Sequence, residues 1–108
     1  MSARPLIIRE WADRDVANAV SYYQREASAR VALRFIDAIQ DSYRRIADDP
    51  LIGSSRYAHE MEMPGLRFSM VRRFPYLVFY HSVGEGVEVW RILHGHREIP
   101  GRMREPPE

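Results

Sequence analysis

The sequence predicts an α+β fold in which a helical hairpin packs on one face of a small, mainly antiparallel sheet, in the order β-α-α-β-β-β-β. Two observations support this prediction. Apolar residues recur at helical spacing in the first half of the chain and alternate at strand spacing in the second half. With 108 residues, the chain has room for a single domain, 1–108, with a core of its own.

The first predicted elements are a strand over 5–10 and a helix over 12–26. Asp13 is placed to cap the helix N-terminus, because a short acidic side chain can accept a hydrogen bond from the free amides there. The apolar stripe of this helix recurs at spacings of four, three and four, and it comprises Val16, Val20, Tyr23 and Ala27.

A second helix is predicted over 29–48, with Ser28 as its N-cap. Pro50 ends the helix, because proline cannot continue it and restrains the residue before it. Its apolar stripe comprises Ala32, Phe35, Ile39, Tyr43 and Ile46.

The second half of the chain is predicted to form strands over 56–62, 66–72, 75–83 and 86–94. Between the last two strands, Gly84-Glu85 is a two-residue loop with glycine first, as a type II′ hairpin turn requires. If Val83 pairs with Gly86, the register continues as His81 with Glu88, Phe79 with Trp90 and Leu77 with Ile92.

Both faces of this hairpin are apolar. We expect the face with Phe79 and Trp90 to be buried under Phe35, Ile39 and Val20. The opposite face carries Tyr76, Val78, Tyr80, Val87, Val89, Arg91 and Leu93. Because a single helical hairpin covers one face, we expect a partner to cover the other with an amphipathic helix or a strand, or to bind along a free sheet edge.

Composition excludes several classes of protein. There are no cysteines, so neither a disulfide scaffold nor a thiolate metal site is available. No apolar run approaches the roughly 20 residues of a membrane helix, and we expect a cytoplasmic protein without a membrane contact. A net charge of +1 is not that of a protein that coats nucleic acid, so we expect no sequence-specific DNA binding by this chain. All basic residues are arginine.

Six short motifs, in their order and spacing, carry a family resemblance across nearly the whole chain. They are Trp11-Ala12, Ala32-x-x-Phe35-x-x-Ala38-Ile39, Asp49-Pro50-x-x-Gly53, Pro64-Gly65-Leu66-Arg67, Tyr76-Leu77-Val78-Phe79-Tyr80 and the ending from Arg91 to Pro100. This pattern resembles the RelE/ParE superfamily of toxins from bacterial type II toxin–antitoxin modules, also called plasmid-stabilisation proteins. The ending, RILHGHREIP, is most similar to that of the ParE branch.

The resemblance implies different activities for the two branches. RelE-like members cleave mRNA on the ribosome without a metal, whereas several ParE-like members inhibit DNA gyrase. In both branches an antitoxin wraps and silences the toxin. A third alternative is a degenerate member that binds its antitoxin and has lost its toxicity.

Metal-free RNA cleavage needs a base, an acid and cations around one phosphate. The residues of this chain that could supply them are Arg67, Arg73, Tyr80, Arg91, His94 and His96. The lysines that many RelE-like nucleases use have no counterpart, which favours inhibition by protein contact over catalysis. For that contact, with antitoxin or target, we expect Tyr76, Val78, Tyr80, Val89, Arg91, Leu93 and Arg97.

No cofactor or metal is expected. His94-Gly95-His96 could place two imidazoles on one side of a strand, but no third ligand is evident nearby. A purely structural role for Arg91 is equally open, because a partly buried arginine in a strand could pair with a carboxylate from a helix or the tail.

Overall fold

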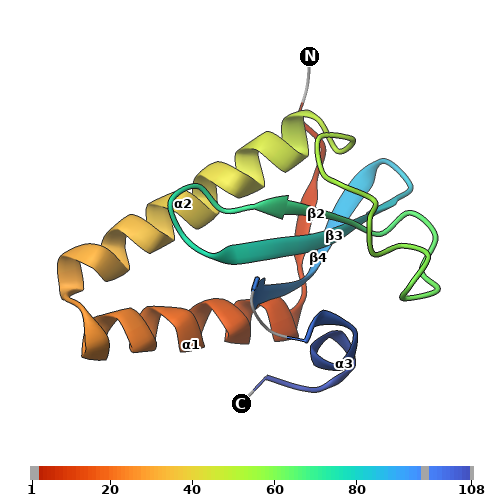
Figure 1. The fold of residues 1–108 in the computed structure, drawn as a ribbon. Coiled ribbons are helices and arrows are strands. Elements are labelled where there is room, and N and C mark those ends of the chain that lie inside the picture. Colours follow the sequence, from red (N-terminus) through yellow and green to blue (C-terminus); the bar gives the residue numbers. More distant parts are fainter. Residues whose placement is uncertain (1–2, 96–97, 108) are drawn as a thin grey trace.

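Seven elements of secondary structure build the fold in the computed structural model, which describes residues 3–95 and 98–107 (Figure 1). They are β1 (Leu6–Ile8), α1 (Glu10–Glu26), α2 (Ala29–Asp48), β2 (Arg67–Met70), β3 (Tyr76–Val83), β4 (Gly86–His94) and α3 (Ile99–Arg104). The predicted α+β fold with a helical hairpin on a sheet is confirmed. The short helix α3 was not predicted.

The sheet has four strands in the order β1-β4-β3-β2. β1 runs parallel to β4, with Leu6 opposite Val87, and the other two pairs of neighbours are antiparallel. The chain therefore starts at one edge, passes through the helical hairpin and returns at the opposite edge (Figure 1). This arrangement is the mainly antiparallel sheet that the sequence predicts.

α2 has the predicted bounds, whereas α1 begins two residues before the predicted start and has a different cap. The Ser28 hydroxyl accepts the amide of Val31 at 3.1 Å at the start of α2, as predicted. The predicted cap of α1 is wrong, because the helix begins at Glu10 with Arg9 at the cap position and no side-chain cap. Asp13 instead lies in the first turn, where a negative charge interacts favourably with the helix dipole.

A β-bulge between β3 and β4 changes the predicted register halfway along the hairpin. The pairs Val83–Gly86 and His81–Glu88 are as predicted. Beyond Tyr80, which lies opposite Val89, the register shifts by one, and the observed pairs are Phe79–Arg91, Val78–Ile92 and Leu77–Leu93. The predicted pairs of Phe79 with Trp90 and of Leu77 with Ile92 are therefore wrong, because Trp90 is the extra residue of the bulge.

The helices cover the face of the hairpin opposite to the one predicted. Phe35 and Ile39 of α2 pack in one core with Val78, Tyr80 and Val89. The other members from β4 are Val87 and Ile92. The prediction that Phe79 and Trp90 lie under the helices is wrong. Both faces are apolar, so alternation along the strands does not identify which face the helices cover, and beyond the bulge Ile92 and Leu93 exchange their predicted faces.

The second face of the sheet is covered by other parts of the same chain. Phe79 lies there in a second core, whose other buried members are Met61, Leu66, Leu77, Leu93, Ile99 and Met103. The cover consists of α3 and the segment before β2. The strand predicted over 56–62 is wrong, because this segment forms successive turns, with the amide of Met61 bonded to the carbonyl of Tyr57 at 2.9 Å.

In the described part of the chain, no helix combines the length and the apolar character needed to cross a membrane.

Candidate functional site

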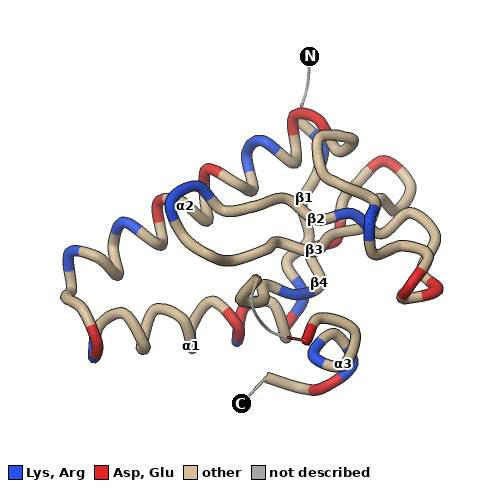
Figure 2. Tube along the Cα trace, in the orientation of Figure 1, with Lys and Arg blue, Asp and Glu red and all other residues tan. Residues whose placement is uncertain are grey.

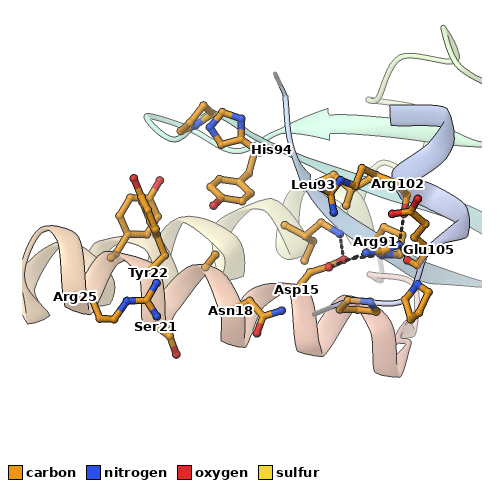
Figure 3. Close-up of a pocket in the computed structure, with 17 residues that line it drawn as sticks. Asp15, Asn18, Ser21, Tyr22, Arg25, Arg91, Leu93, His94, Arg102 and Glu105 are labelled. Carbon is orange, nitrogen blue, oxygen red and sulfur yellow. Dashed lines mark hydrogen bonds and ion pairs between the residues drawn. The ribbon is translucent and has the colours of Figure 1, made fainter. Parts of the chain in front are cut away.

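Arg91 lies buried where α1, β4 and the C-terminal segment meet (Figure 3). Its Nε and Nη2 donate to the two carboxylate oxygens of Asp15, at 2.8 and 2.9 Å. Asp15 Oδ2 also accepts the amide of Ile92 at 2.9 Å. The last β1 residue paired with β4 is Ile8, opposite Val89. The Asp15 carboxylate therefore accepts a backbone amide of β4 that lies just beyond the end of the pairing with β1.

The remaining nitrogen of Arg91 holds the C-terminal segment. Nη1 donates to the carbonyl oxygens of Arg102 and Glu105, the latter at 2.6 Å. These carbonyls lie at the end of α3, where the Arg102 carbonyl also accepts the amide of Glu105 at 3.3 Å. The indole of Trp11 lies against the same guanidinium, 5.3 Å from ring centroid to Cζ. Arg91 is therefore a structural residue that ties the C-terminal segment to α1 and β4.

An open groove of about 770 Å³ lies between α1 and the C-terminal segment. In Figure 3, Tyr22 and Arg25 line one end and Glu105 lines the other. The rings of Tyr76 and His94, 5.3 Å apart and edge to face, form the opposite wall. Aromatic rings beside an exposed guanidinium suit contact with a protein or peptide surface.

A second polar cluster holds the loop that follows α2. The hydroxyl of Tyr80 accepts the amide of Gly53 at 2.9 Å and donates to the carbonyl of Pro50 at 2.8 Å. Arg67 Nη1 donates to the carbonyl of Gly53 at 2.7 Å. A Cβ on Gly53 would lie 2.6 Å from both the Tyr80 hydroxyl and the carbonyl oxygen of Phe68, so only glycine fits.

Burial raises the pKa of the Tyr80 hydroxyl, while the Gly53 amide and the Arg67 guanidinium oppose that increase. The hydroxyl is therefore a neutral phenol at physiological pH, and it donates a hydrogen bond to the Pro50 carbonyl. Its polar atom is engaged inside the fold and does not face solvent.

The predicted nuclease residues are dispersed over the described part of the fold. Arg67 and Tyr80 hold the loop after α2, and Arg91 is buried against α1. Arg73 is exposed at the β2–β3 turn, and His94 ends β4 beside Tyr76. His96 lies outside the described residues, as does Arg97 from the predicted contact set. Arg67, Tyr80 and Arg91 thus each donate hydrogen bonds inside the fold.

The face predicted to bind a partner is not exposed. Val78, Tyr80 and Val89 are fully buried under the helices, and Tyr76 is half-buried against the same core. Leu93 and Arg91 are also buried, Leu93 in the second core because the bulge shifts its register. The expectation of an open apolar face is therefore wrong, since the helical hairpin covers Val78, Tyr80 and Val89 and the second core takes up Leu93.

Sequence reasoning did not identify Asp15 as the partner of Arg91, although a signal for it exists. Ala12, Asp15 and Ala19 recur at spacings of three and four and are the buried residues of α1. A carboxylate in such a stripe indicates a buried basic partner, because an isolated buried charge is too costly. Within residues 3–95 and 98–107, no group of three or more metal-ligating side chains converges.

Comparison with known proteins identifies the family. Residues 6–99 match the model of a family described as the ParE toxin of type II toxin–antitoxin systems, parDE. No curated protein matches the sequence. Among solved structures, a chain from the chromosomal ParDE toxin–antitoxin system of P. aeruginosa has a similar fold, with a TM-score of 0.72 and 20% sequence identity. The match covers 85% of this chain and 96% of the P. aeruginosa chain.

Proposed function

Because the chain belongs to the ParE toxin family of type II toxin–antitoxin systems, we propose that it inhibits DNA gyrase by direct protein contact and is neutralised by its antitoxin. Gyrase as the target follows from the resemblance of the RILHGHREIP ending to the ParE branch.

The observation that carries this proposal is the engagement of Arg67, Tyr80 and Arg91 inside the fold. A nuclease needs an acid, a base and charge-stabilising groups within hydrogen-bond reach of one phosphate. Here the Arg67 guanidinium donates to the Gly53 carbonyl and the Tyr80 hydroxyl to the Pro50 carbonyl. The Arg91 guanidinium is neutralised by Asp15, and the residue is 3% exposed. Internal roles for these residues support inhibition by contact.

A supercoiling assay tests the proposal. Purified toxin is added to gyrase, relaxed plasmid and ATP, with and without the antitoxin encoded in the same operon. We expect the toxin to stop supercoiling and the antitoxin to restore it. Primer extension on cellular mRNA after toxin induction is run in parallel.

Codon-phased cuts in mRNA, with gyrase unaffected, would overturn the proposal in favour of a ribosome-dependent endonuclease. Antitoxin binding without either effect would indicate a member that has lost its toxicity.

Two variants separate these mechanisms further. On the contact proposal, Tyr80→Phe and His96→Ala change growth inhibition only as far as they change stability. On the nuclease alternative, either substitution abolishes toxicity in a protein that remains fully folded. Thermal unfolding of each purified variant provides the required measure of folding.

A further inference from the structure

A groove of about 460 Å³ lies between α2 and the turn that joins β2 to β3. Its apolar lining consists of Val31, Ala38 and Phe74. Phe74 is half-buried and packs edge to face on Phe35, so this part of the groove is held by the first core. The groove therefore offers a firm apolar floor between α2 and the β2–β3 turn.

Positive charge surrounds this groove. Arg34, Arg72 and Arg73 line it and are exposed, and Asp37 is its single acidic residue. Beside it, Asp41 is approached by three guanidinium groups, from Arg45 at 3.1 Å, Arg44 at 3.9 Å and Arg72 at 4.0 Å. Figure 2 shows the blue β2–β3 turn next to α2.

We name these residues the α2–turn surface. It holds five arginines, Arg34, Arg44, Arg45, Arg72 and Arg73, against the two aspartates Asp37 and Asp41. The surface thus has an excess of three positive charges, on a chain whose net charge is +1. Such a local excess attracts an acidic partner.

Backbone strain at Arg73 is an independent observation at the same place. Its φ is +67°, in the left-handed region that glycine and asparagine adopt at lower cost. An arginine held in that conformation at the rim of a charged groove indicates that its side chain is needed there, because a glycine would satisfy the turn with less strain.

The composition of the surface favours a protein segment over nucleic acid. Asp37 and Asp41 would repel a continuous phosphate backbone, whereas a peptide can place its carboxylates between them. The floor of Val31, Ala38 and Phe74 fits an apolar side chain, which a phosphate backbone does not carry.

The geometry points to the α2–turn surface as the docking site for an acidic segment of the antitoxin, with carboxylates on Arg34, Arg72 and Arg73 and one apolar side chain on Phe74. This inference rests on the proposed neutralisation by an antitoxin and adds where and through which chemistry it binds. It predicts that the segment carries acidic residues on both sides of an aliphatic or aromatic residue.

The test is titration calorimetry of the full-length toxin with the purified antitoxin from the same operon. The charge-removal variant is Arg34→Gln/Arg72→Gln/Arg73→Gln. Its matched control is Arg4→Gln/Arg14→Gln/Arg56→Gln, which removes three exposed arginines elsewhere. We expect the charge-removal variant to bind at least tenfold more weakly and with a smaller dependence on salt. The control stays within about threefold of the wild type, because distant charges are screened.

Arg73→Gly keeps the test independent of folding. Glycine relieves the strain at φ +67°, so this variant melts at a higher temperature than the wild type and yet binds the antitoxin more weakly.

The possible results are distinguishable. Equal loss of affinity in the charge-removal and control variants, or full affinity in either the charge-removal variant or Arg73→Gly, overturns the docking site while leaving neutralisation intact. If the wild-type toxin does not bind the antitoxin, both the docking site and the proposed neutralisation are overturned. A labelled 20-base-pair DNA duplex serves as a third arm. If the charge-removal variant loses affinity for DNA and keeps the antitoxin, the surface is a nucleic-acid contact and the inference is wrong.

Discussion

Replacing Arg91 by alanine removes the cation from a carboxylate that stays buried. The side chain of Asp15 is 8% exposed, and among the described residues it would retain the amide of Ile92 as its hydrogen-bond donor. Removing one member of a buried ion pair costs about 3–5 kcal/mol. A domain of this size is stable by about 5–15 kcal/mol, and at about 4 °C per kcal/mol its melting temperature falls by roughly 15 °C.

A matched control is provided by Arg9. Its Nη1 lies 2.8 Å from Glu88 Oε2, the same distance as in the Arg91–Asp15 pair, but these side chains are 53% and 20% exposed. Exposed pairs contribute at most about 1 kcal/mol. Arg9→Ala is therefore expected to lower the free energy of unfolding by about that amount, including its stacking on Trp90.

Urea unfolding followed by tryptophan fluorescence measures both variants, and hydrogen exchange adds a local readout. In Arg91→Ala the amides of Arg102 and Glu105 should lose protection, because the guanidinium that ties the end of α3 to β4 and α1 is gone and their bonds within α3 open more often. Arg9→Ala leaves them protected. The reasoning is refuted if Arg91→Ala is no more destabilising than Arg9→Ala, or if the C-terminal amides stay equally protected.

Four further outcomes follow from the contacts of single residues. Gly53→Ala forces a Cβ to within 2.6 Å of the Tyr80 hydroxyl, so we expect a loss of at least 2 kcal/mol in urea unfolding, about the cost of overpacking; an unchanged midpoint would contradict the observed fit. Tyr80→Phe leaves the Gly53 amide and the Pro50 carbonyl without their partner and should lower the free energy of unfolding in urea by about 1–3 kcal/mol. An unchanged free energy of unfolding would mean that water replaces the hydroxyl. Burial raises the pKa of both Tyr43 and Tyr80, so the stability they contribute is complete below the unfolded-state value near 10 and is lost as pH rises above it. The urea midpoint should therefore fall between pH 9 and 11, and a flat profile would refute this. Phe79→Ala opens the second core and should lower the free energy of unfolding by about 3–5 kcal/mol. Thermal unfolding measures this loss, and a nearly unchanged melting temperature would mean that Phe79 is exposed.

The helical half of the fold could be predicted in detail from the sequence. Ser28 caps α2 as expected, and Phe35, Ile39 and Ile46 from the predicted stripe are buried. These features depend on interactions within a few residues along the chain, which a spacing of three and four reports directly. The start of α1 differs by two residues from the prediction. Arg9 at the cap position makes no side-chain cap, so no capping residue in the sequence marks where the helix begins.

The candidate site was predicted less well, because its partners are far apart in sequence. Arg91 was recognised as an arginine in need of a carboxylate, but Asp15, which lies 76 residues earlier, could not be singled out. The roles of Arg67 and Tyr80 depend on where the loop after α2 meets the sheet. This contact forms only in the tertiary structure, and no local sequence pattern encodes it.

By itself, the sequence determined the α+β class, the order of the main elements, the two helical stripes and the family resemblance, because all of these depend on local periodicity and motif spacing. The tertiary structure decided that Trp90 is the extra residue of a bulge, that Val78 and Val89 lie under the helices, and that 56–62 and α3 cover Phe79. Alternation gives both faces of β3 and β4 an apolar character. Long-range packing therefore decides which face the helical hairpin covers and which face α3 and the segment before β2 cover.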